Sequence, residues 1–257
     1  MILTLDIGNS NIVVSGIRNF KTIFSGRIKT DKNYSEEDIA SHIDFIFKLN
    51  KVNAGDFKGA VVSSVVPCVT EKTAFAAEKL IGKKAYIVGK DIDFGIDIKM
   101  DNPDKVGEDM LVDAAAALYE YEPPMLIFDL GTASTCSVID KNGSYIASII
   151  APGASISLKA LTECTAKLPK IKLDKPGSIL AKNTDDSMRS GIIYGNAAMI
   201  DGICDRVFDE LGYKVKIIAT GGIGGLITPY CRHEIVYEPD LLTKGLSVLW
   251  EKANNNN

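Results

Sequence analysis

Two short stretches of the sequence repeat one arrangement of residues that suits phosphate binding. Each has an apolar run, then Asp-x-Gly, then small polar residues; the first extends from Asp6 to Asn11 and the second from Asp129 to Thr135. A glycine lets backbone N–H groups approach phosphate oxygens without a Cβ in the way, and an Asp at a strand end can hold a hydrated Mg²⁺. The same residues are also common in ordinary hairpin turns. Because the arrangement occurs twice, we predict two turns that face each other across a cleft and hold a polyphosphate.

A third stretch, from Thr220 to Gly225, contains four glycines directly after an apolar run. Bare glycine backbone offers a flat surface against which an adenine ring can lie. A flexible loop between a strand and a helix would have a similar composition. The three stretches together, in this order, predict a nucleotide-binding protein.

The elements that must position these stretches alternate between strands and helices in both halves of the chain. Each Asp-x-Gly turn is the tip of a predicted hairpin. Further strands are expected at 59–66, 86–88 and 215–219, and helices from Ser35 onward and at 70–81, 113–121, 157–167, 186–211 and 241–250. This alternation predicts α/β layers in two similar domains, residues 1–117 and 118–257, joined by the helix at 113–121.

Composition restricts the class of protein. The chain has 257 residues, 46% hydrophobic and 24% charged, which is typical of a globular protein with a real core. Its net charge of −4 argues against nucleic acid as a partner, and no stretch is apolar for long enough to span a membrane. There are five cysteines without a C-x-x-C pair and only two histidines, so we expect free thiols, no zinc site and a cytoplasmic location.

Segments spread along the whole chain resemble one family. Together with the three glycine-containing stretches, the chain resembles type III pantothenate kinases of the actin/hexokinase/Hsp70-like superfamily. The supporting segments are Ser63–Pro67, Gly107–Asp109, Ile150–Gly153, Ala166–Pro169, Lys182–Thr184, Ser190–Gly195 and Thr243–Leu246. The resemblance implies two ribonuclease-H-like domains of the actin-like ATPase fold, each a mixed sheet flanked by helices, and a homodimer. It also implies transfer of the ATP γ-phosphate to pantothenate, the first step of coenzyme A synthesis, with Mg²⁺ and either K⁺ or NH₄⁺.

Site residues follow from the same resemblance. The ATP-binding residues would be Asp6, Ile7, Gly8, Asn9, Ser10, Asn11, Ile12, Val13, Thr132, Gly221 and Gly222. The pantothenate-binding residues would be Met100, Gly107, Glu108, Asp109, Met110 and Thr184. Asp109 would be the general base, Asp129 would bind the monovalent cation, and Asp6 would hold Mg²⁺ through water. Glu108 would raise the pKa of Asp109 if the two lie close, whereas two acids on a loop are commonly just solvated.

Two positions depart from the family pattern on the acceptor side. Met110 stands where an Arg is usual, and Met100 stands where a Tyr is usual. An Arg supplies a positive charge and a fork of donors suited to a carboxylate. Other residues could compensate, the acceptor could differ, or the chain could be a nucleotide-binding homologue with little catalytic activity. A phosphatase of the same superfamily is a further alternative.

Three glycines and the final residues carry separate expectations. Gly191, Gly195 and Gly202 fall inside the predicted helix 186–211. Because each costs about 1 kcal/mol relative to Ala in an exposed helix, we expect close packing there against a neighbouring element. The four Asn residues at 254–257 are expected to fray.

Overall fold

The computed structural model describes residues 1–255, and these residues pack as two compact units. The first unit comprises Met1–Ile96, Asn102–Tyr121 and the segment from Asp240 onward. The second comprises Asp97–Asp101 and Glu122–Pro239.

A five-stranded mixed sheet with the order β3-β2-β1-β4-β5 forms the centre of the first unit. Its strands are β1 (Ile2–Ile7), β2 (Asn11–Arg18), β3 (Lys21–Lys29), β4 (Ala60–Ser64) and β5 (Ala85–Ile87). Its helices are α1 (Glu36–Leu49), α2 (Pro67–Ile81), α3 (Glu108–Glu120) and α7 (Leu241–Asn255). Alternate residues of β1 face two different apolar clusters: Leu3 and Leu5 pack in the cluster that includes α1 and α2, and Ile2 packs in the cluster that includes α3 and α7. The sheet is therefore buried on both faces.

Local sequence explains where the first helices begin and end. Ser35 caps α1 in a capping box with Asp38, in which each residue satisfies a backbone N–H of the other. Pro67 occupies the first turn of α2, where its missing N–H has no consequence. Gly82 ends α2 with φ of 62°, a left-handed conformation that glycine adopts without strain.

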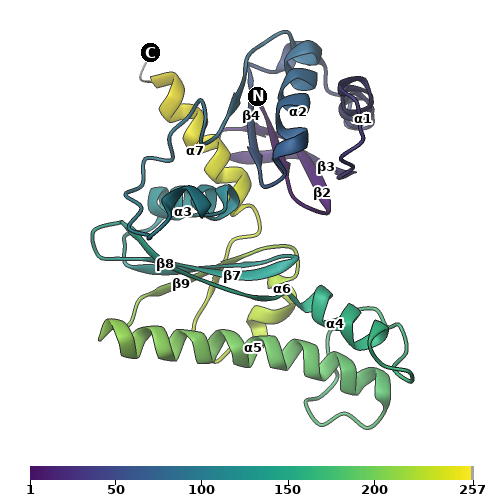
Figure 1. The fold of residues 1–257 in the computed structure, drawn as a ribbon, viewed down its shortest axis with the longest axis vertical. Coiled ribbons are helices and arrows are strands. Elements are labelled where there is room, and N and C mark those ends of the chain that lie inside the picture. Colours follow the sequence, from purple (N-terminus) through teal and green to yellow (C-terminus); the bar gives the residue numbers. More distant parts are fainter. Residues whose placement is uncertain (256–257) are drawn as a thin grey trace. The chain divides into compact units, whose positions relative to one another are not determined.

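The second unit contains a five-stranded mixed sheet of order β10-β9-β6-β7-β8. Its strands are β6 (Met125–Leu130), β7 (Ala133–Ile139), β8 (Tyr145–Pro152), β9 (Lys216–Thr220) and β10 (Val236–Tyr237). Its helices are α4 (Ala154–Glu163), the long α5 (Thr184–Leu211) and the single turn α6 (Gly224–Ile227). Helix α5 extends along one side of this unit (Figure 1), and buried residues from Ile192 to Phe208 pack it against the sheet.

The two sheets share one topology. In each, the strand that ends in Asp-x-Gly pairs antiparallel with the next strand along the chain and parallel with a later one, as β1 does with β2 and β4, and β6 with β7 and β9. The predicted fold class, two mixed sheets flanked by helices, is confirmed.

The structure differs from the sequence-based expectations in the bounds of several helices. Helix α3 begins at Glu108, five residues before the predicted start, so Asp109 lies in the first turn of a helix and not on a loop. Helix α7 continues to Asn255, where fraying was expected; residues 256–257 lie outside the described residues. Helix α7 also packs in the first unit, and the predicted domain limits, 1–117 and 118–257, remain a prediction.

Among residues 1–255, none of the helices is both long enough and apolar enough to cross a bilayer.

Candidate functional site

The first Asp-x-Gly turn connects β1 and β2 through three residues. The N–H of Gly8 donates to the carbonyl of Asn11 at 3.0 Å, and the hydroxyl of Thr30 donates to the carbonyl of Gly8 at 2.7 Å. The side chains of Asn9, Ser10 and Asn11 are exposed. The turn is therefore fixed by the neighbouring strand while its polar side chains remain available to a ligand.

Glu108 joins the start of α3 to the same edge of the sheet. Asp6 pairs with Ser63 of β4 in the parallel register. The next residue of β4, Ser64, donates its backbone N–H to Oε2 of Glu108 at 3.2 Å. The first turn of α3, which contains Asp109, is thus attached at the carboxyl ends of β1 and β4, the edge where open α/β sheets bind their ligands.

Burial controls the acidity of both acids in this turn. It raises the pKa of Asp109, while a hydrogen bond of 2.9 Å from the Met110 N–H opposes the rise. Burial is also the main cause of the raised pKa of Glu108; the Ser64 hydrogen bond opposes this rise and the charge of Asp109 adds to it. The sequence-based argument attributed a raised Asp109 pKa to Glu108, and the structure assigns it to desolvation.

Gly107 and Met110 flank the acids in ways that constrain them. A Cβ at Gly107 would lie 2.5 Å from Oδ1 of Asp109, so a larger residue would displace this carboxylate. The side chain of Met110 is only 6% exposed. The position where the family has an Arg is consequently an apolar, buried one in this chain.

In the second unit, β6 and β7 are connected through only two residues, Gly131 and Thr132. The N–H of Gly131 donates to the carbonyl of Ala133 at 3.1 Å. Gly153 packs directly against this turn, because a Cβ there would collide with the carbonyls of Thr132 and Gly131. The turn therefore rests on a backbone support that only glycine permits.

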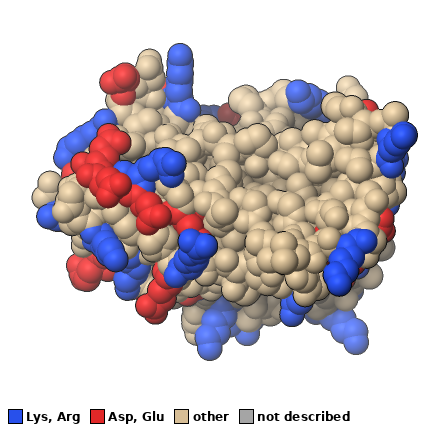
Figure 2. Space-filling view, turned by 90° about the horizontal axis from the view of Figure 1, so that it is seen from below, with Lys and Arg blue, Asp and Glu red and all other residues tan. Residues whose placement is uncertain are grey.

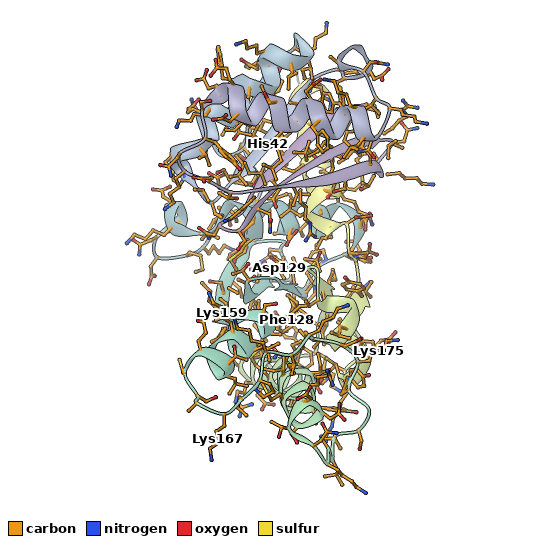
Figure 3. The ribbon with its side chains drawn as sticks, turned by 90° about the vertical axis from the view of Figure 1, so that its right-hand side faces the viewer. His42, Phe128, Asp129, Lys159, Lys167 and Lys175 are labelled. Atoms are coloured by element: carbon orange, nitrogen blue, oxygen red, sulfur yellow. The ribbon has the colours of Figure 1, made fainter. Side chains whose placement is uncertain are left out.

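The glycine-rich stretch after β9 lies against the second carboxylate. Asp129, at the end of β6 (Figure 3), pairs in parallel register with Thr220. Gly221 follows with φ of 91°, and a Cβ there would lie 2.5 Å from Oδ1 of Asp129. The hydroxyl of Tyr237 donates to the carbonyl of Gly221 at 3.0 Å and holds this approach in place. Gly222 is exposed and has open space beside it, as a flat surface for a ring requires.

Each turn also has a buried serine hydroxyl close by. Within residues 1–255, the hydroxyl oxygens of Ser63 and Ser134 are buried without a hydrogen-bond partner. Ser63 lies beside Asp6 in the register of β1 and β4, and Ser134 pairs with Leu130 directly after the second turn. A buried hydroxyl without a partner is costly, so both sites have unsatisfied polar groups that a ligand could pair with.

The predicted site residues divide between the two units. Asp6 to Val13 and Gly107 to Met110 lie together in the first unit, linked through β4. Asp129, Thr132, Gly221 and Gly222 lie together in the second unit. Met100 and Thr184 are also in the second unit: Met100 is half-buried after an isolated bridge of Ile98 to Tyr145, and Thr184 is exposed at the start of α5.

Three supporting residues were not identified from sequence. Thr30 and Gly153 hold the backbone of the two turns, and Tyr237 holds that of Gly221. They lie 22, 21 and 16 residues from Gly8, Thr132 and Gly221, respectively. A single threonine or tyrosine at such separations carries no local sequence signal. Only Gly153 could have been found, since it belongs to one of the segments that carry the family resemblance.

Comparison with solved structures defines the class of fold. The structure resembles a protein described as a Baf family transcriptional activator from Campylobacter jejuni, with a TM-score of 0.59, 19% identity and coverage of 98% of this chain and 99% of the other. It also resembles component A of the (R)-2-hydroxyglutaryl-CoA dehydratase of Acidaminococcus fermentans, with a TM-score of 0.56, 12% identity and 98% coverage of both chains. With the two matching sheets, these similarities place the chain in the actin-like class of α/β folds.

Sequence comparison defines the family within that class. The family model for type III pantothenate kinase matches residues 2–206. The type III pantothenate kinase of Geotalea uraniireducens (strain Rf4) is 36% identical over 252 residues, with 98% of each chain covered. That of Agathobacter rectalis is 37% identical over 255 residues, covering 99% of this chain and 98% of the relative. The chain belongs to the type III pantothenate kinase family, as the sequence motifs predicted.

Proposed function

We propose that the chain transfers the γ-phosphoryl group of ATP to the primary hydroxyl of pantothenate. The observation that supports this most directly is the full-length relationship to proteins named for this activity. The local geometry fits it, because Asp109 is a partly desolvated carboxylate at the strand edge beside the first turn. A carboxylate with a raised pKa is suited to accept the hydroxyl proton during transfer.

Phosphoryl transfer depends mostly on positioning and on neutralising charge. In the first unit, the residues from Asp6 to Val13 would bind phosphate oxygens. In the second, Thr132 would add a hydroxyl, and Gly221 with Gly222 would accept the adenine ring. Glu108, Gly107 and Thr184 would contact pantothenate, with Glu108 positioned through its bond from Ser64.

Two cations are part of this proposal, and the residues fit them. Asp6 is a half-buried carboxylate beside exposed Asn and Ser side chains, a set of oxygens that suits a hydrated Mg²⁺. The backbone of Gly221 packs closely against the carboxylate of Asp129. A carboxylate in this setting suits a weakly held monovalent cation such as K⁺ or NH₄⁺. When bound, the cations supply charge neutralisation for the phosphates. Equal activity in buffers with only Na⁺ and in buffers with K⁺ would contradict the monovalent site.

The decisive assay measures ATP consumption with and without pantothenate. Consumption that requires pantothenate supports the kinase, and consumption without any acceptor supports the phosphatase alternative. Nucleotide binding without turnover supports the second candidate, a nucleotide-binding homologue with a changed acceptor or little activity. The specific observation that favours this second candidate is the buried, apolar Met110 where the family has an Arg.

We also propose that the chain forms a homodimer in the cytoplasm. Gly191, Gly195 and Ala198 form an exposed line on α5, and a Cβ at either glycine would meet nothing within 4 Å. Within residues 1–255, no other element therefore provides the close packing predicted for Gly191 and Gly195. Figure 2 shows a broad area without charged residues on the face that it views, from below in Figure 1. Within α5, no charged residue occurs from Ser190 to Ile200. A surface of this kind suits a two-fold contact, and a monomer mass in light scattering at micromolar concentration would contradict it.

The cytoplasmic location is supported by five cysteines that are all free.

A further inference from the structure

A cavity of about 550 Å³ lies in the first unit at the end of the β1–β2 hairpin opposite the Gly8 turn. Ile2 pairs with Ile17 at the cavity end, and Ile7 pairs with Ile12 at the turn end. Five residues of strand, at about 3.3 Å each, separate the two ends by roughly 17 Å. The cavity is therefore distinct from the proposed ATP and pantothenate residues, none of which lines it.

The floor of the cavity is apolar and well fixed. It is lined by buried residues of β1, β2 and α7, among them Ile2, Ile17 and Trp250, which is 7% exposed. The indole ring of Trp250 packs directly against the backbone of Gly59 and contacts the ring of Tyr86 edge-on, with ring centroids 5.5 Å apart. Because Trp250 is almost fully buried, it fixes the floor of the cavity, and the more exposed aromatic side chain of the lining is the half-buried Phe20.

One wall is formed by the tight turn between β2 and β3. Asn19 and Phe20 both have positive φ, 52° and 59°, so the turn is a sharp one. The ring of Phe20 stacks on that of Tyr119 of α3, with centroids 5.4 Å apart. The wall is thus attached to a helix rather than free, and it adds a second aromatic surface beside Trp250.

The rim of the cavity carries more positive than negative charge. Arg18 and Lys58 lie on it with one acid, Glu251. Both cations act on the amino group of Met1, whose pKa is lowered first by burial and then by Arg18 and Lys58. The charge of Asp56 opposes this lowering. An anion bound at the rim would gain two cationic partners, Arg18 and Lys58.

We propose that this cavity binds a small organic anion, with an apolar body against Phe20 above the Trp250 floor and one acidic group at Arg18 and Lys58. Apolar floor, aromatic wall and few convergent polar groups are the general features of small-molecule sites, and about 550 Å³ is within their usual size. Neither an inorganic anion nor a neutral aromatic molecule would use both parts of the cavity.

The chain offers a direct reporter, because Trp250 is its only tryptophan. The untagged protein is titrated with 8-anilinonaphthalene-1-sulfonate, an aromatic anion whose absorption overlaps tryptophan emission. We expect saturable quenching of Trp250 with one site per chain, unchanged by saturating Mg²⁺–ATP. Arg18→Gln and Lys58→Gln should each weaken binding by about fivefold, as expected for a partly exposed charge pair. The matched control is Lys79→Gln, an exposed lysine on α2, and it should leave binding unchanged.

Four results would overturn the proposal. The first is equal affinity in the wild type and the Arg18→Gln, Lys58→Gln double variant, both substitutions being at exposed positions that do not threaten folding. The second is displacement of the probe by Mg²⁺–ATP. The third is equally tight binding of the uncharged N-phenyl-1-naphthylamine, which would show an apolar hollow only. The fourth is equal competition by inorganic phosphate, which would show a simple anion site.

Discussion

The two Asp-x-Gly turns have the same place in the same sheet topology, yet they are supported differently. The first has three residues between its strands and exposes three polar side chains, from Asn9 to Asn11. The second has two residues, and glycine backbone at Gly153 and Gly221 packs closely against it and its Asp. The longer turn suits wrapping around phosphate oxygens, and the shorter one suits holding a carboxylate in a fixed place. One arrangement of residues can thus serve two tasks, depending on the residues that pack behind it.

The largest expected effect concerns Asp109, the acid beside the first turn that has no counterpart among the predicted site residues of the second unit. Asp109→Asn should lower kcat by about 10²–10⁴-fold, the usual contribution of a general base, with little change in ATP affinity. Steady-state kinetics and a nucleotide-binding titration measure the two quantities. Glu251→Gln, at an exposed acid in the same unit, is a control for the loss of one charge. An unchanged kcat in Asp109→Asn would remove this residue from the mechanism.

The same variant has an expected effect on the pH dependence of stability. Burial raises the pKa of Asp109, so ionisation of this carboxyl costs native stability as the pH rises through the raised pKa. Asn does not ionise. The free energy of unfolding should therefore match the wild type at pH values below the ordinary Asp range and exceed it at neutral pH. Denaturation at several pH values measures this, and a deficit at neutral pH would contradict the desolvation argument.

The second test breaks the close packing of Gly221 against Asp129 in the second unit. Gly221→Ala would place a Cβ against Oδ1 of Asp129 at a φ of 91°. Strain of the backbone and overpacking together should lower the free energy of unfolding by about 2 kcal/mol or more, and ATP affinity should fall. Gly177→Ala in the same unit, with open space and no positive φ, is the control. Equal stability of the two variants would show that the turn does not depend on this contact.

The third test concerns acceptor binding. Met110→Arg restores the family's charge, and a charge-assisted hydrogen bond of about 1.5–3 kcal/mol should lower the pantothenate KM about tenfold or more. The ATP KM should change little. Because Met110 is buried, the variant's thermal unfolding must be measured too, since an unpaired buried charge destabilises. If a folded Met110→Arg, alone and with Met100→Tyr, kept the wild-type pantothenate KM, other residues would form the acceptor pocket.

The smallest effects compare two hydroxyls, one that supports the Gly8 turn and one that supports Gly221. Thr30→Val removes the bond to the Gly8 carbonyl, and Tyr237→Phe removes the bond to the Gly221 carbonyl. Each should weaken ATP binding by about fivefold, because one neutral hydrogen bond contributes about 1 kcal/mol. A titration of ATP into each variant measures this. If only one of the two substitutions had an effect, nucleotide binding would depend on only one of these two supports.

How much of the fold and of the candidate site could be predicted from the sequence depends on how far apart the interacting residues lie in the chain. The hairpins, the Ser35 cap and the Gly82 stop follow from neighbouring residues, and they were predicted correctly. The start of α3 was missed because Glu108 is held there by a hydrogen bond from the backbone of Ser64, 44 residues away in the chain. The support of Gly221 by Tyr237 depends on two strands meeting in the folded sheet, which no local pattern encodes. The phosphate-binding role of Asp6 to Val13 stays a prediction, and it rests on a glycine that lets the backbone approach a ligand without a Cβ in the way.

The return of the chain to its first unit has a consequence for synthesis on the ribosome. The segment from Glu122 to Pro239 is continuous, so almost all of the second unit is complete once it has left the exit tunnel. The first unit still lacks α7, which supplies Leu246, Leu249 and Trp250 to the cluster on one sheet face. Although it is translated first, the first unit must therefore wait with one apolar face uncovered until the second has been made. During that interval the nascent chain is most vulnerable to aggregation and to proteases, and a chaperone would find its binding site there.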